Sequence, residues 1–219
     1  MIQLKPKLAI PLEKLWKEHK GEDYAQYTPH ALSEIPESGL LFIGINPSLT
    51  RNKEELKKLI GTKPNFGTEE NKEHKYFKKF IEISEATQLP WGHLDIFYLR
   101  ETSQNSVKDL LKRENGRDFL NQQWVLTKSI LDALLQGSEK RIVVVSNAFA
   151  RDIIMGNVNG LSEGYPLEFD EKMSQEILKV NPCGMNSDIY TSLNKVLNIT
   201  DSLETLRNNF HNYYLKNLF

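Results

Sequence analysis

The sequence predicts an α/β fold with a central, mainly parallel, four-stranded sheet. Two observations lead to this prediction. Four short apolar runs alternate with segments of helical periodicity, which is typical of strands joined by right-handed crossover helices. One of the runs, residues 141–145 (Arg-Ile-Val-Val-Val), is β-branched and uninterrupted, as expected for a central strand of a parallel sheet.

The N-terminal part of the chain contributes one strand and three helices. Pro11 suits a helix start, because its fixed φ fits the first turn, where its missing N–H has no helical partner to lose. The first strand is expected at 40–43 (Leu-Leu-Phe-Ile), where the apolar run stops at Gly44. Helical periodicity follows over 51–61 and 69–88, and the second segment places several aromatic residues on or near one stripe.

The rest of the chain contributes three further strands. They are expected at 93–99, 141–145 and 177–180. Two helices separate the first of these strands from the second, and a short helix that Ser146-Asn147 caps follows the second. Helices are expected near the C-terminus, over about 187–218.

Length and composition indicate one domain. The chain has 219 residues, enough to bury a core without metal or disulfide support, and no Gly/Ser linker divides it. We therefore expect a single domain over 1–219, with a helical N-terminal extension over about 1–38. No apolar stretch reaches 18 residues, and the first residues lack the apolar core of a signal peptide. We expect a cytoplasmic monomer with no membrane partner.

Cys183 is the only cysteine in the sequence. With a single cysteine, the chain cannot form an internal disulfide, a four-cysteine iron–sulfur cluster or a cysteine-rich zinc site. The five histidines show no metal-ligand spacing, so we expect no metal and no other cofactor.

Polar residues follow the predicted strands, at the edge of the sheet where ligands bind in parallel α/β folds. After the first strand comes Gly44-Ile45-Asn46-Pro47. Gly44 lets the backbone approach a ligand closely, and Pro47 restricts the backbone of Asn46, which holds the amide in place. Taken alone, this tetrapeptide is also a good turn.

The later strands add further polar candidates. The second strand contributes Asp95, with Arg100 at its end, and the third is followed by Asn147. Each has an ordinary structural interpretation as well: Asp95 as a solvent-facing strand position and Asn147 as a helix N-cap. The fourth strand runs into a loop that consists of Asn181, Pro182, Cys183, Gly184 and Met185.

Together these residues resemble the uracil-DNA glycosylase superfamily. Residues 44–47 match the first motif of the mismatch-specific uracil/thymine branch, and residues 181–185 are similar to its second motif, Asn-Pro-Ser-Gly-Leu. Cys183 stands where that motif has Ser and Met185 where it has Leu, while Ser48 follows the first motif where Gly is common. The resemblance spans residues 40 to 195.

The resemblance implies a three-layer αβα sandwich and a DNA glycosylase of base excision repair. Such an enzyme flips a nucleotide out of DNA and hydrolyses the N-glycosidic bond of uracil or another damaged or deaminated base. Asn46 would orient the attacking water as the catalytic residue, and Met185 in the intercalating loop would fill the gap in the stack. The base would be bound by Gly44, Ile45, Phe66, Asp95 and Asn147, with Phe66 stacking on its face.

Asp95 stands where many relatives carry a base-reading Asn. An ionised carboxylate only accepts hydrogen bonds and would repel a uracil carbonyl. Three interpretations are open: Asp95 is protonated in a dry pocket, the substrate is a base other than uracil, or Asp95 does not read the base.

Two other functions are also open. The first is a non-catalytic nucleic-acid or nucleotide-binding protein that keeps the glycosylase fold, which the near-neutral net charge of −1 favours. Residues 51–79 nevertheless hold nine basic and five acidic residues, a local excess that can attract DNA or simply form a solvated helix face. The second is a small-molecule hydrolase, for which Ser146 lacks a nucleophile-elbow motif.

Overall fold

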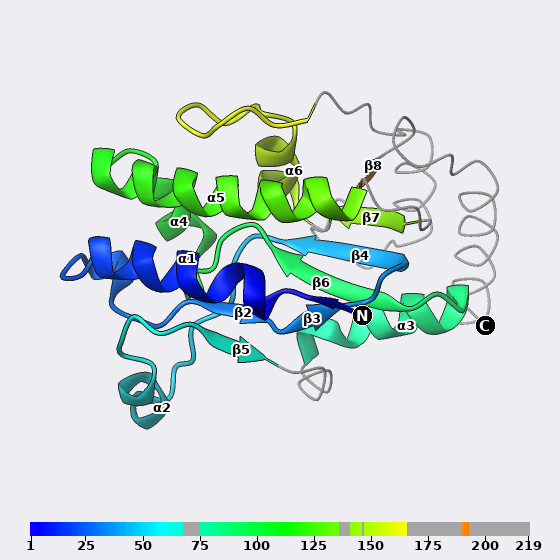
Figure 1. Ribbon diagram of the computed structural model, residues 1–219, viewed down its shortest axis with the longest axis horizontal. Helices are drawn as coiled ribbons and strands as arrows, with labels where there is room; N and C mark the ends of the chain where they lie inside the picture. The colour runs from blue at the N-terminus through cyan, green and yellow to red at the C-terminus, as the bar shows by residue number, and fades with distance from the viewer. Residues whose placement is uncertain (68–74, 136–140, 146, 166–189, 193–219) are drawn as a thin grey trace.

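The computed structural model describes residues 1–67, 75–135, 141–145, 147–165 and 190–192. Three parallel strands lie at its centre, with β4 (Gly39–Gly44) between β6 (Trp91–Asp95) and β7 (Arg141–Val145), as Figure 1 shows. The predicted α/β class with parallel strands is therefore confirmed. A short strand, β8 (Tyr190–Ser192), pairs antiparallel with β7. The strand expected at 177–180 lies outside the described residues.

Two predicted elements differ from the structure near these strands. Residues 190–192 form β8, although this segment lies within the range of about 187–218 where helices were expected. The Tyr-Thr-Ser sequence of this segment suits a strand, which pairs with β7. The second strand ends at Asp95, whereas the apolar run predicted it to continue to residue 99. Residues 96–99 are buried as a loop instead of a strand.

The loop after β6 is fixed by hydrogen bonds to elements distant in sequence. The N–H groups of Ile96 and Phe97 donate to the carbonyls of Gly44 and Ile45. The next two N–H groups, of Tyr98 and Leu99, donate to the fully buried Gln123 side chain at 2.7 and 3.1 Å. Because every one of these donors is satisfied, the apolar run can be buried without continuing the ladder.

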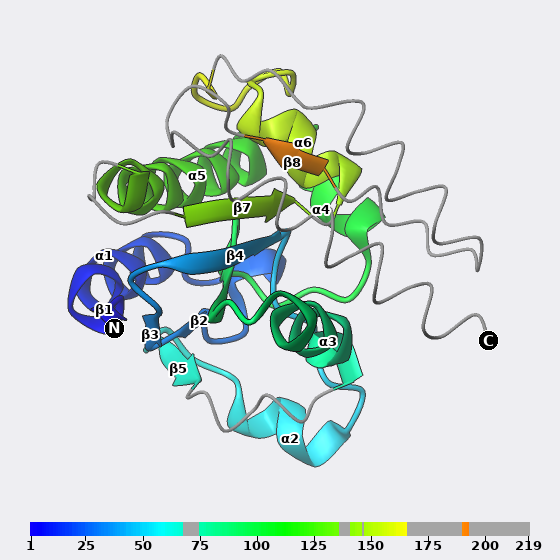
Figure 2. The same cartoon turned by 90° about the vertical axis from the view of Figure 1, so that its right-hand side faces the viewer.

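Helices cover the central strands from both sides. In Figure 2, α1 (Lys5–Glu18) and α5 (Glu114–Leu135) lie on one side of the sheet, and α3 (Lys78–Thr87) and α6 (Ala148–Ile154) on the other. Two short helices, α2 (Lys53–Lys58) and α4 (Gln104–Leu110), lie in the connections. All six residues of β4 are buried, which places the core along this strand. None of the described helices combines the length and apolar character needed to cross a membrane.

The N-terminal segment contains more strand than expected. Helix α1 begins at Lys5, with Pro6 in its first turn, so Pro11 lies inside the helix and does not start it. Two small sheets follow: β1 (Ile2–Gln3) with β3 (Glu34–Ile35), and β2 (His30–Leu32) with β5 (Asn65–Gly67). Strand β2 also contacts β6, and this brings His30 toward the carboxyl end of the central sheet.

Candidate functional site

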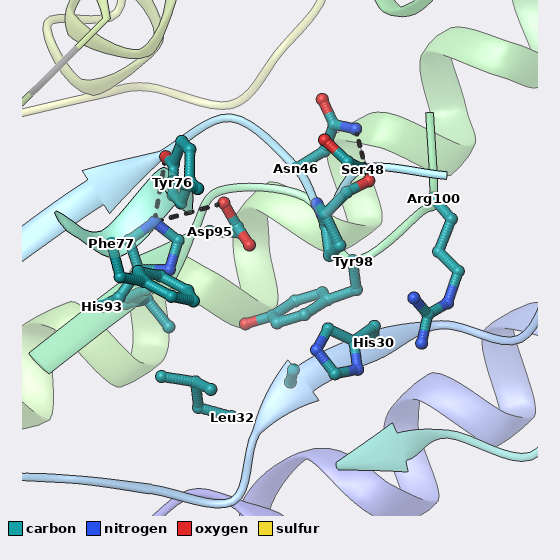
Figure 3. A pocket seen from close by; sticks show the side chains of 13 residues that line it. His30, Leu32, Asn46, Ser48, Tyr76, Phe77, His93, Asp95, Tyr98 and Arg100 are labelled. Atoms are coloured by element: carbon teal, nitrogen blue, oxygen red, sulfur yellow. Dashed lines mark hydrogen bonds and ion pairs between the residues drawn. The ribbon is translucent and has the colours of Figure 1, made fainter. Parts of the chain in front are cut away.

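A cavity of about 480 Å³ lies at the carboxyl ends of β4 and β6, within the size range of about 300–1,000 Å³ that ligand pockets occupy. Figure 3 shows its lining. The segment after β4, the end of β6 with the loop that follows it, and the 3-10 turn Lys75–Phe77 supply the walls, and β2 closes one side. The lining residues are His30, Ala31, Leu32, Asn46, Pro47, Ser48, Tyr76, Phe77, His93, Leu94, Asp95, Tyr98 and Arg100.

The strand register explains why Asn46 and Asp95 meet in this cavity. Gly44, the last residue of β4, is the partner of Asp95, the last residue of β6. A Cβ built on Gly44 would overlap Asp95 Oδ1 and lie 2.8 Å from His93 Nε2. Glycine at this position thus makes room for the side chains of the neighbouring strand, which is a different reason from the close ligand approach that the sequence suggested.

The amide of Asn46 is held by its nitrogen. Nδ2 donates to the carbonyl oxygens of Pro47 at 3.0 Å and Glu101 at 2.6 Å. Because a carbonyl oxygen only accepts hydrogen bonds, these two partners identify the atom that faces them as the amide nitrogen. Among the described residues, no donor reaches Oδ1. This oxygen is available to accept a hydrogen bond from a water or a ligand.

Asp95 is a neutral acid at pH 7. Only 14% of its side chain is exposed, and burial raises its pKa to about 8. His93, 3.7 Å away through Nε2, is also buried, and this lowers its pKa to about 3. The two side chains therefore meet as an uncharged acid and an uncharged imidazole, not as an ion pair. A protonated carboxyl offers one donor and one acceptor side by side.

Aromatic side chains form one wall beside Asp95. Tyr76 and Phe77 come from the 3-10 turn Lys75–Phe77 that precedes α3, with ring centroids 5.1 Å apart. The Tyr76 hydroxyl lies 3.3 Å from His93 Nε2, and Tyr76, which is 49% exposed, lines the cavity. Tyr98 also lines the cavity, and its hydroxyl is hydrogen-bonded to that of Thr127 at 2.9 Å.

The other predicted site residues lie elsewhere. Gly44 and Ile45 are buried in and just after β4, behind the lining. Phe66 lies on β5 opposite Ala31 and is not among the lining residues. Asn147 caps α6 with its side-chain oxygen, which is the structural interpretation that the sequence allowed. The loop Asn181, Pro182, Cys183, Gly184 and Met185 lies outside the described residues.

Several lining residues were missed from the sequence. The aromatic pair Tyr76 and Phe77 was visible, but it was interpreted as part of a stripe along a helix expected over 69–88. His30 gave no signal, because it lies in a segment that was expected to be helical. Arg100 was noted only as the end of a strand.

Comparisons with protein-family models, with curated proteins and with solved structures found no match to this chain. The function proposed below therefore depends on the motifs and on the geometry of the cavity.

Proposed function

We propose that the protein is a DNA glycosylase that hydrolyses the bond between deoxyribose and a uracil-like base. The observation that carries this proposal is the shared cavity of Asn46 and neutral Asp95, at the ends of two adjacent parallel strands. The resemblance of residues 44–47 to the first motif of the uracil-DNA glycosylase superfamily supports the same function. Helices on both sides of the sheet in Figure 2 support the finer proposal of a three-layer sandwich of the uracil-DNA glycosylase type.

Asp95 would read the base. The imide edge of uracil presents an N–H donor beside a carbonyl acceptor, and a protonated carboxyl presents the complementary acceptor and donor. Of the three interpretations open at the sequence level, the burial of Asp95 favours the protonated acid. Tyr76 and Phe77 line the same cavity and supply faces for stacking, which is worth about 1–3 kcal/mol per base.

Asn46 would orient the water. Its Oδ1 accepts a hydrogen bond from a water molecule whose oxygen faces C1′ of the sugar. The N-glycosidic bond breaks with its electron pair leaving on the base, the water oxygen bonds to C1′, and a water proton passes to solvent. A neutral amide is a poor base, so Asn46 acts by positioning, and we expect a slow enzyme.

DNA is the proposed partner. Extruding a nucleotide costs a few kcal/mol and costs least at a mismatch, so a mismatched uracil is the preferred substrate. Exposed basic residues lie on and near α2, the short helix below the central sheet in Figure 2, and would contact phosphates: Arg51, Lys53, Lys57, Lys58 and Lys63. Two of the described acids there, Glu54 and Glu55, offset part of this charge.

The test is base excision from labelled duplexes. We expect alkali-sensitive strand breaks at uracil opposite guanine, lower activity at thymine or hypoxanthine, and a loss of roughly 10²-fold or more in Asn46→Ala. Asn121→Ala is the matched control, because this asparagine on α5 accepts a hydrogen bond from the Ser162 N–H away from the cavity. Salt-dependent DNA binding without breaks at any base would instead establish a non-catalytic binding protein.

A further inference from the structure

Arg100 brings a positive charge into the same cavity. It lies at the end of the loop that follows β6, is partly buried, and donates from Nε to the carbonyl of Thr28 at 3.2 Å. Burial lowers its pKa, but a guanidinium stays charged at neutral pH. Within the described ranges, no carboxylate forms an ion pair with it. The proposed reaction gives this charge no role.

His30 lies beside Arg100 in Figure 3 and is uncharged. Its Nδ1 donates to the carbonyl of Asn65 at 3.1 Å. Burial and the positive charge of Arg100 lower the His30 pKa to about 4. The imidazole therefore adds no second positive charge, and its Nε2 carries no proton.

Among the described residues that line the cavity, the net charge is positive at pH 7. His30, His93 and Asp95 are the other described lining groups that titrate below pH 9, and all three are neutral there for the reasons given above. The guanidinium of Arg100 is the charge that remains among them. A half-buried, unpaired cation is costly, so a ligand that brings a negative charge to it is favoured over a neutral one.

The two ends of the cavity suit two parts of one ligand. Figure 3 places Asp95 beside Tyr76 and His93 at one end and Arg100 beside His30 at the other, with Tyr98 between them in this view. The first end offers a neutral donor and acceptor beside aromatic faces, which suits a nucleobase. The second offers a planar cation with its terminal nitrogens unused by described residues, and a guanidinium binds phosphate through two parallel hydrogen bonds.

We propose that Arg100 binds a phosphate group of the nucleotide whose base lies against Asp95. The cavity then takes a nucleotide with its phosphate, not a base alone. This inference rests on the proposed function for the placement of the base. Two phosphate groups have the chemistry that Arg100 would bind. One is the phosphodiester beside an extruded nucleotide, and the other is the 5′-phosphate of a free nucleotide.

The first arm of the test uses free ligands and calorimetry. The parent protein should bind deoxyuridine monophosphate about 10- to 100-fold more tightly than deoxyuridine, because a charge-assisted hydrogen bond contributes about 1.5–3 kcal/mol. Arg100→Gln should remove this preference, and Arg100→Lys should restore part of it. Arg113→Gln is the control, because Arg113 is exposed and pairs with Asp23 at 3.1 Å.

The second arm uses DNA and identifies the source of the phosphate. Uracil oligonucleotides carry a neutral methylphosphonate at one phosphate on either side of the lesion. If the strand supplies the phosphate, one methylphosphonate should slow excision by the parent roughly 10-fold or more and have no further effect in Arg100→Gln. If only the free nucleotide is bound through Arg100, the first arm shows the preference for the monophosphate, and neither methylphosphonate changes excision.

The outcomes separate the two proposals. Equal binding of deoxyuridine and its monophosphate, together with excision that is insensitive to both methylphosphonates, overturns the phosphate site and leaves the glycosylase. A monophosphate preference that Arg100→Gln abolishes, in a protein that excises no base, keeps the phosphate site and overturns the glycosylase. Melting temperatures of all variants show whether Arg100→Gln is folded; if it is not, the comparison of Arg100→Lys with the parent decides.

Discussion

Two asparagines follow buried parallel strands, and they differ in whether a described residue donates a hydrogen bond to the amide oxygen. Asn147, two residues after β7, accepts through Oδ1 from the N–H groups of Phe149 and Ala150 at 2.8 and 3.2 Å. Asn46, two residues after β4, instead donates through Nδ2 to two backbone carbonyls. The oxygen is therefore occupied at the end of β7 and available at the end of β4.

The residues that follow each asparagine cause this difference. Helix α6 begins at Ala148, and the first N–H groups of a helix need an acceptor, which Asn147 supplies. Pro47 has no N–H, and no helix begins directly after it. An asparagine after a strand is thus a candidate for ligand contact when no helix start consumes its oxygen.

The largest effect is expected from Gly44→Ala, which disturbs the end of β4 directly. The new Cβ would overlap Asp95 Oδ1 and lie 3.1 Å from the Tyr76 hydroxyl, so the carboxyl must move. We expect excision to fall roughly 10²-fold or more and the free energy of unfolding to fall by about 1–3 kcal/mol. Single-turnover kinetics and urea unfolding measure the two effects.

Gly21→Ala separates loss of stability from loss of the site. A Cβ at Gly21 meets nothing within 4 Å, but its φ of 107° is strained for alanine. We expect a comparable stability loss of about 1–2 kcal/mol with excision unchanged. Full excision by folded Gly44→Ala would contradict the inferred role of the β4–β6 contact in placing Asp95.

A smaller, pH-dependent effect is expected from Asp95→Asn. Asp95 is the residue of β6 that lies opposite Gly44 at the end of β4. Burial places the Asp95 pKa at about 8, so the parent should lose uracil excision as the pH rises through 8, by about tenfold for each unit above it. An asparagine keeps a donor and an acceptor at every pH. The variant should therefore excise uracil with no such decline between pH 7 and 9, and a parallel decline would contradict the assignment of Asp95 as the base reader.

The same variant makes a prediction about stability. The folded-state pKa of about 8 lies above the ordinary value of 3.8, so between these values the folded protein holds a proton that the unfolded chain has lost. The free energy of unfolding of the parent should therefore fall relative to that of Asp95→Asn, by about 1.4 kcal/mol for each pH unit between 5 and 7. Urea unfolding at pH 5, 6 and 7 tests this, and a constant difference would show that Asp95 is not protonated by burial.

The central strands were predictable because their signals are local. The apolar runs at 40–43 and 141–145 match β4 and β7 within one residue at either end. Parallel neighbours then place the following residues at one edge, and Asn46 and Asp95 do line one cavity. The end of β6 was not predictable, because the loop after it depends on Gln123, a side chain more than 20 residues away.

The chemistry of the cavity depends on contacts that periodicity does not encode. His30 arrives there because β2 pairs with β5, which lies 35 residues further along the chain. The charge state of Asp95 follows from its burial beside Gly44 and His93, so the sequence left three interpretations of this residue open. The sequence pattern thus located the edge of the sheet at which the cavity lies, while packing decides the charge of the cavity lining.

The smallest effect is expected from Asn147→Ala, at the end of β7. Loss of the N-cap should lower the free energy of unfolding by about 1 kcal/mol, measured by urea unfolding, and leave excision unchanged. Asn147→Ser should recover most of the stability, because a cap needs only an acceptor for the N–H groups of α6. Asn46→Ser should not recover excision, because a hydroxyl has a single proton and cannot donate to two carbonyls while holding an oxygen toward water. Loss of excision in a fully folded Asn147→Ala would mean that the β7 end also serves the ligand, and the distinction between the two strand ends would be wrong.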